Sequence, residues 1–240
     1  MPTLRSILFW TGFYISTILV TSILTISFVL PFRGRYAISR GWPMFNLWWL
    51  KITCGLNFKV NGVENIPDEA VIFMSKHQST WETITYQLFL PPSVWVIKRE
   101  LLWIPIFGWG VAMLNPVAIN RSSGKKSLQQ LISKGRKKLD AGINIVIFPE
   151  GTRTTAGEPT KYRPGGAVLA AKTGHKVVPI AHNAGYYWPK GQFHKHPGTI
   201  QVVIGPAIET KDKSASQILK ETETWIEDQM KILGGRDFSN

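Results

Sequence analysis

The sequence predicts an α/β domain with a substantially parallel central sheet flanked by helices, preceded by an N-terminal hydrophobic helical motif that anchors it to a membrane. Short apolar strands alternate with helical segments throughout the second part of the chain. The continuous apolar run at 143–148 is typical of a strand buried on both faces. No charged side chain occurs in residues 6–32. We therefore predict membrane-anchoring helices at 1–55 and the α/β domain at 56–240.

The N-terminal segment is long enough to enter a membrane. Its 27 uncharged residues would form a helix about 40 Å long, more than a hydrocarbon core of about 30 Å requires. It lacks a small-residue cleavage site, which argues against a removed signal peptide. Three tryptophans in 41–50 favour the headgroup boundary. Two geometries fit: a spanning helix followed by an interfacial one, or a helical hairpin within one leaflet. Basic residues that follow the segment predict a cytoplasmic body, namely Arg33, Arg35, Arg40 and Lys51.

Charge and cysteine content narrow the class of protein. The 240 residues carry a formal net charge of +13, which suits a negatively charged partner. With the apolar N-terminus, this charge indicates membrane lipid or a phosphate-bearing substrate and argues against a nucleic-acid binder. The single cysteine, Cys54, excludes an intramolecular disulfide, and its apolar neighbours predict a buried core residue.

The remaining elements follow from periodicity and from turn residues. Prolines and glycines delimit the segments, as at Pro91-Pro92, Gly142 and Gly174. The stretch 101–120 is uncharged, but its prolines and glycines predict a loop and short helix in place of a second span. The predicted strands are 58–60, 71–74, 94–98, 143–148, 176–181 and 199–204, and the predicted helices are 79–90, 125–141, 164–173 and 214–233.

A histidine and an acid five positions apart follow the apolar run 71–74. His77 can take a proton from a hydroxyl if Glu82 fixes its tautomer and supports its positive charge. Residues five apart on a helix are rotated by about 140°, so the two meet only if His77 lies in the loop and Glu82 in the first turn. The competing interpretation is a capping box in which Ser79 caps the helix and Glu82 returns to its amide.

A second group of polar residues follows the buried strand directly. Gly151 permits close backbone approach, Thr152 supplies a hydroxyl, and Arg153 supplies a planar fork suited to phosphate. Ligands bind at strand ends of this kind in α/β sheets. The alternative is a tight turn in which Glu150 and Arg153 pair.

Together these motifs resemble the glycerolipid acyltransferase family. The resemblance covers residues 74–183 through four blocks in order, of which the third is 148–153 and the fourth 178–181. The first block is His77 with four intervening residues and an acid (HX4E), and it departs from the family at Glu82, where aspartate is usual. The second block is Lys98-Arg99-Glu100-Leu101 followed by Pro105, Gly108 and Arg121.

The resemblance implies direct acyl transfer from a thioester, acyl-CoA or acyl carrier protein, to the sn-2 hydroxyl of lysophosphatidic acid. The product would be phosphatidic acid, and no cofactor or metal is implied. His77 would be the general base, Glu82 its orienting partner, and Lys98 the donor to the developing oxyanion. Backbone amides near Gly151 or at 179–180 are alternatives for that donor.

Arg153 would hold the acceptor phosphate, and residues 101–113 could line an acyl tunnel. The site would lie at the cytoplasmic face of a bacterial inner membrane. Rival functions are acylation of another lyso-lipid or a lipid A precursor, a thioesterase, and a non-catalytic anchor for anionic lipid. Further substrate-binding residues implied by the resemblance are Arg121, Glu150, Gly151, Thr152 and Pro179.

Overall fold

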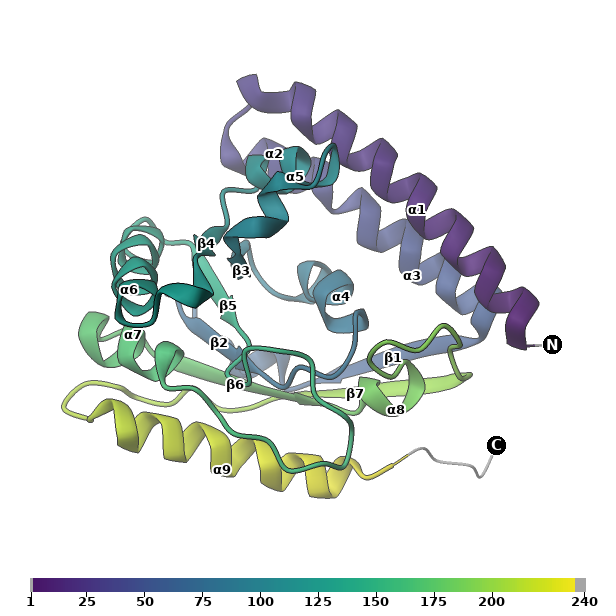
Figure 1. The fold of residues 1–240 in the computed structure, drawn as a ribbon. Coiled ribbons are helices and arrows are strands. Elements are labelled where there is room, and N and C mark those ends of the chain that lie inside the picture. Colours follow the sequence, from purple (N-terminus) through teal and green to yellow (C-terminus); the bar gives the residue numbers. More distant parts are fainter. Residues whose placement is uncertain (1, 236–240) are drawn as a thin grey trace.

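A computed structural model describes residues 2–235 as a seven-stranded sheet with helices on both faces (Figure 1). The strand order is β1-β7-β6-β2-β5-β3-β4. The strands are β1 (Leu56–Asn61), β2 (Ile72–Ser75), β3 (Ser93–Lys98), β4 (Val117–Ile119), β5 (Asn144–Ile147), β6 (Val177–His182) and β7 (Gly198–Ile204). The α-helices are α1 (Pro2–Ile26), α2 (Phe32–Ser39), α3 (Gly41–Cys54), α4 (Trp81–Phe89), α5 (Phe107–Met113), α6 (Lys125–Leu139), α7 (Gly165–Thr173), α8 (Ala184–Tyr187) and α9 (Ala215–Leu233).

Every strand pair of the sheet is parallel except β6 with β7. The prediction of a substantially parallel sheet flanked by helices is therefore confirmed, with one antiparallel pair added. The carboxyl ends of β2, β3, β5 and β6 consequently meet at one edge of the sheet, which we call the carboxyl edge.

The two faces of the sheet build two apolar cores. Phe73 and Val146 face α1, α3 and α4, whereas Ile72, Met74 and Ile145 face α6, α7 and α9. Figure 1 shows α1 and α3 side by side on the first face, with α4 between them and the sheet. Both faces are covered, which explains why the central strands are continuous apolar runs.

Helices α1 and α3 form an antiparallel hairpin that packs closely. A side chain at Gly12 would place its Cβ 2.3 Å from the Trp49 indole nitrogen, so only glycine fits there. The Asn46 amide donates to the Ser16 hydroxyl at 3.0 Å within the buried interface. The predicted division at residue 55 falls between α3 and β1, and the apolar core is continuous across it, because Phe9 and Leu50 belong to the cluster that contains Phe73.

Helix α1 lies along the catalytic domain and contacts it near both ends. At one end the Trp10 indole donates to the Phe193 carbonyl at 3.2 Å. At the other end Gly110 of α5 lies so close to Thr21 that an added Cβ would come within 2.5 Å of it. With its 3₁₀ extension, Pro2–Val29 is long and apolar enough to cross a membrane. Its outward face is apolar and exposed, with Leu4, Ile7, Leu8, Tyr14, Ile15, Ile18, Leu19, Ile23 and Ile26.

Most predicted elements lie within two residues of their observed bounds. The stretch 101–120 is broken, as predicted, into a 3₁₀ turn at Arg99–Trp103 and the short helix α5, and it also contains the short strand β4, which was not predicted. Cys54 is buried, which confirms its predicted place in the core. Helix α9 begins with a capping box between Ser214 and Gln217.

Candidate active site

The carboxyl edge brings most of the predicted site residues together. His77 follows β2, Glu150 follows β5, and Lys98 ends β3. The site thus forms where parallel strands end, because each strand delivers its next residues to the same edge.

His77 and Glu82 are in direct contact. His77 lies in the loop after β2 and Glu82 in the first turn of α4, and the distance from His77 Nδ1 to Glu82 Oε1 is 2.8 Å. The predicted meeting of the two groups is confirmed. A carboxylate only accepts, so Nδ1 carries the proton and Nε2 keeps its lone pair. The imidazole stacks on Phe148 with ring centroids 3.9 Å apart, which fixes the plane of the ring.

The same carboxylate oxygen also organises the loop. Glu82 Oε1 accepts the backbone N–H of Gln78 at 2.9 Å and that of Ser79 at 2.8 Å. The second contact is half of a capping box, although the helix begins at Trp81 and the Ser79 hydroxyl accepts from the Trp81 amide. The two interpretations of Glu82 are therefore both partly correct, because one oxygen serves both.

Burial tends to raise the pKa of Glu82, which is 0% exposed. The nearby His182 and the hydrogen bond from His77 outweigh burial, so its pKa is lowered. The charged form is thus favoured beside the imidazole, as an orienting group for a base requires.

A second histidine, His182, lies buried behind the loop and was not predicted as a site residue. Its Nε2 lies 2.9 Å from the Lys76 carbonyl, and its Nδ1 accepts the Ala184 amide at 3.2 Å. The Ala184 donor leaves Nδ1 unprotonated, so Nε2–H donates to Lys76. Burial lowers the pKa of His182, which favours this neutral form. His182 thereby holds the Lys76 carbonyl, which belongs to the peptide group between Lys76 and His77.

The Glu150 carboxylate faces inward. It is 4% exposed, and Oε1 accepts the His77 backbone N–H at 3.1 Å and lies 3.7 Å from Lys76 Nζ. Within the described residues it forms no ion pair with Arg153, so that alternative is wrong, whereas its contact with substrate stays a prediction. Burial raises the pKa of Glu150 to about 7, against the lowering effect of Lys76.

Lys76 joins this loop to the C-terminal helix. Its ammonium donates to Glu227 Oε1 of α9 at 2.7 Å, and Tyr162 donates to the same oxygen at 2.8 Å. Lys76 is almost fully buried, so Glu227, its nearest carboxylate, supplies the charge that a buried ammonium requires, and Glu150 adds a second charge when it is ionised. A lysine directly after an apolar strand was the available signal for Lys76, whereas nothing in the sequence singled out Glu227.

Two arginine hydrogen bonds connect the segment after Glu150 to neighbouring parts of the site. Arg153 Nη1 donates to the Thr80 hydroxyl at 2.7 Å. On the other side, the half-buried Arg121 donates to the Gly151 carbonyl. Gly151 has φ +71°, and its N–H donates to Phe148, so this amide is already used and is not an oxyanion donor. Thr152 is exposed.

Lys98 is exposed near the carboxyl edge, whereas Pro179 is buried inside the sheet. If the strand register is extended, Lys98 lies level with residue 76. The two residues are two strands apart, on the order of 10 Å, and the Lys98 side chain is exposed. Pro179 is buried inside β6, paired with Met74, and its carbonyl accepts from Gly205 at 2.9 Å. Its one polar group is thus occupied in the sheet, and substrate contact by Pro179 stays a prediction.

A cavity of about 320 Å³ opens beside Thr80, at the end of the loop that carries His77. Arg153 and Thr80 line it, together with Trp10 and Tyr14 of α1, with Trp188 and with residues 191–193. Residues 101–113 do not line it, and their role as a tunnel wall stays a prediction.

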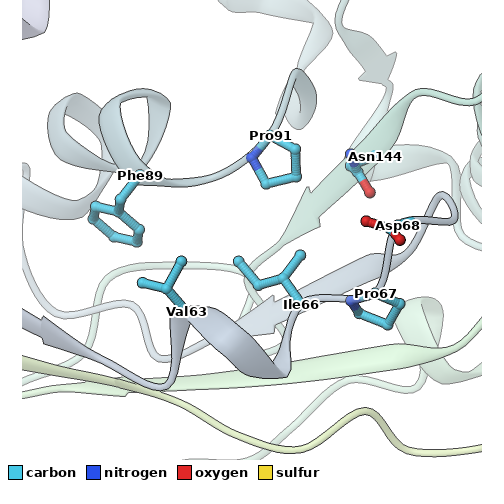
Figure 2. Close-up of a pocket in the computed structure, with 7 residues that line it drawn as sticks. All are labelled: Val63, Ile66, Pro67, Asp68, Phe89, Pro91 and Asn144. Atoms are coloured by element: carbon cyan, nitrogen blue, oxygen red, sulfur yellow. The ribbon is translucent and has the colours of Figure 1, made fainter.

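A second cavity, of about 350 Å³, lies at the opposite edge of the sheet (Figure 2). Val63, Ile66 and Phe89 give it apolar walls, and Asp68 and Asn144 are its polar groups. The Asn144 amide is committed to the backbone, accepting from Val71 and donating to Pro92. Among the residues that line this cavity only Asp68 is ionisable, so the cavity offers no acid–base pair. Within residues 2–235, no group of three or more His, Cys, Asp or Glu side chains is arranged to hold a metal ion.

The pKa of Glu150 predicts a pH dependence of folding stability. Its ordinary value is 4.5 and its folded value about 7, so the folded protein binds more protons than the unfolded chain between these values. Stability should therefore fall as pH rises through that interval, by at most about 3 kcal/mol. Glu150→Gln should flatten this fall, as measured by denaturant unfolding at about pH 5, 6 and 7. Parallel curves for the two proteins would contradict the assignment.

Comparison with known proteins agrees with this geometry. The acyltransferase family model matches residues 57–183. The chain is 45% identical over 206 residues to a 1-acyl-sn-glycerol-3-phosphate acyltransferase of Pseudomonas aeruginosa, an alignment that covers 84% of this chain and 80% of that one. A protein of the same description from Borreliella burgdorferi is 27% identical and is covered to 80%.

The fold also has a solved counterpart. The crystal structure of the 1-acyl-sn-glycerophosphate acyltransferase of Thermotoga maritima superposes with a TM-score of 0.81 at 22% identity, covering 98% of this chain and 97% of that one. The family model spans the elements that carry His77, Glu82 and Arg153. This confirms the resemblance found in the sequence: the chain belongs to the acyltransferase family.

Proposed function

We propose that this acyltransferase transfers an acyl group from a thioester to the sn-2 hydroxyl of lysophosphatidic acid, forming phosphatidic acid. The observation that carries the proposal is the contact of His77 with Glu82 beside a cavity that contains Arg153. The relative with 45% identity is described by the same activity. A base, a carboxylate that orients it and a cation for phosphate are the groups this reaction needs.

The reaction proceeds in one displacement. His77 Nε2 takes the proton of the acceptor hydroxyl as its oxygen attacks the thioester carbonyl carbon. The tetrahedral intermediate then expels the thiolate as the C–S bond breaks, and the imidazolium returns the proton to the sulfur. Glu82 holds Nδ1–H throughout and stabilises the imidazolium. Cys54, 23 positions before His77 and buried in the core, is not needed as a nucleophile.

The remaining groups stabilise charge. Lys98, exposed at the carboxyl edge, is the proposed donor to the developing oxyanion. Arg153 is the proposed partner of the acceptor phosphate, since its planar fork matches phosphate oxygens. Arg121 braces Gly151 from the other side and supports the same loop. The proposal invokes no resident cofactor, and the donor is acyl-CoA or acyl carrier protein.

We further propose that the protein sits on the cytoplasmic face of a bacterial inner membrane, with the helical hairpin in one leaflet. Helix α1 is apolar and exposed along its outward face, yet it contacts the catalytic domain at Trp10 and at Thr21. A helix that crossed the bilayer would carry one of these ends away from the domain. Lying in the interface satisfies both contacts and still buries the apolar face.

Removal of the base tests the mechanism. His77→Ala should lower kcat with lysophosphatidic acid by about 10²-fold or more, because general-base assistance is typically of that size. The measurement is release of free thiol from matched donors in detergent. His175→Ala, at the opposite edge of the sheet, serves as the control and should keep normal turnover. Near-normal turnover of His77→Ala would exclude the mechanism, and thiol release independent of acceptor would indicate a thioesterase.

Arg153→Lys tests the phosphate contact. A point charge replaces a bidentate fork, so the KM for lysophosphatidic acid should rise about tenfold while the donor KM stays unchanged. Steady-state kinetics with each substrate varied in turn gives both constants. Arg163→Lys, an exposed arginine on the neighbouring segment, is the matched control. An unchanged acceptor KM in Arg153→Lys removes this residue from the role.

Glu227 tests whether α9 supports the catalytic loop. Glu227→Gln should lower kcat by up to about tenfold with little change in either KM, because the loop that carries His77 is held less rigidly once Lys76 loses its nearest anion. Asp228→Asn is the control, since it removes only an exposed pair with Lys231 on the same helix. Equal kinetics for the two variants would show that Lys76 does not depend on α9.

A further inference from the structure

The cavity lined by Arg153 and Thr80 also has a wall made by the N-terminal helix. Trp10 and Tyr14 of α1 belong to its lining. Their rings stack, with centroids 5.5 Å apart and planes at 22°. An N-terminal helix that served only as an anchor would not need to present aromatic rings to this cavity.

A buried lysine fixes this wall in place. Lys195 is 3% exposed, and its ammonium lies 3.8 Å from the centroid of Trp10 and 4.9 Å from that of Trp188. It also donates to the Phe193 carbonyl at 2.9 Å, the oxygen that accepts the Trp10 indole N–H. Cation–π contact and a shared acceptor therefore tie α1 to the segment after α8.

Two residues that line the cavity, Thr80 and Arg153, connect it to the loop that carries His77. Thr80 lies three residues after His77, and the amide of Thr154, the residue after Arg153, donates to the His77 carbonyl at 2.8 Å. Within the described chain, no Asp or Glu forms an ion pair with Arg153. The cavity thus combines a cation that has no anion of its own with aromatic walls, which suits a phosphate attached to an apolar chain.

We propose that α1 forms part of the acceptor site: with the phosphate on Arg153, the glycerol and the first methylenes of the sn-1 chain lie against Trp10 and Tyr14. This inference rests on the proposed function. The chain would continue over Ile18, which lies one turn after Tyr14 and is 53% exposed on the outward face of α1. Anchoring and recognition of the acceptor would then be performed by one helix.

Tyr14→Ala is the test, because Tyr14 is 59% exposed and its loss should not prevent folding. With long-chain lysophosphatidic acid, the acceptor KM should rise about fivefold, the order expected for one lost aromatic contact, with the donor KM unchanged. With a short-chain lysophosphatidic acid, the rise should be similar, because that acceptor keeps the first methylenes that contact Tyr14.

Ile15→Ala is the matched control, since Ile15 is 55% exposed on the same helix and does not line the cavity. Flotation with vesicles of phosphatidylethanolamine and phosphatidylglycerol shows whether either variant loses membrane binding. Lys195→Met, which keeps the packing but removes the charge, should raise the acceptor KM as Tyr14→Ala does.

The outcomes separate the two proposals. If the wild-type protein does not acylate lysophosphatidic acid, the proposed function fails and this inference fails with it. If the wild type is active but Tyr14→Ala and Ile15→Ala behave alike, only the inference fails. A rise in KM accompanied by an equal loss of vesicle binding would likewise overturn it, because attachment would then explain the whole effect.

Discussion

The structure of the site depends on one buried oxygen, Glu82 Oε1. It accepts hydrogen bonds from the His77 ring and from the backbone amides of Gln78 and Ser79. A carboxylate that is 0% exposed needs such donors, since burying an unpaired charge costs several kcal/mol. The donors fold the loop around the oxygen, and the same bonds set the tautomer of His77. The fold of the loop and the tautomer of His77 therefore depend on the same oxygen. A substitution at Glu82 would disturb both.

A second constraint is charge balance at the carboxyl edge. Glu150 and Glu227 flank the Lys76 ammonium, and Glu150 also receives the His77 amide. Burying an ion pair seldom adds net stability, because desolvation offsets the attraction. What the arrangement supplies is position: the peptide before the imidazole is held by His182, and the ammonium one residue away is held from α9. The base can then meet its substrate with little reorganisation.

Sequence patterns predicted the parts of this site that are local in the chain. His77 and Glu82 lie five residues apart, so a loop followed by a helix start was sufficient to bring them together. The continuous apolar strands predicted a parallel sheet, but apolar runs carry no direction, and the antiparallel pairing of β6 with β7 could not be read from them. Glu227 lies 151 positions from Lys76, and an amphipathic helix gives no sign of which acid turns inward. The motif around Glu150 specified residue types without specifying that its carboxylate faces the core.

The placement of α1 links membrane attachment to the chemistry. A lysophospholipid is held in a bilayer by its chain. Full extraction would expose that chain to water and cost about 0.8 kcal/mol for each methylene. With α1 in the interface, as proposed, most of that cost is avoided, because the chain would pass from lipid onto Tyr14 while only the headgroup moves toward Arg153. This geometry requires α1 to stay close to the catalytic domain along its length. The contacts of Trp10 with Phe193 and of Thr21 with Gly110 meet that requirement at the two ends of the helix.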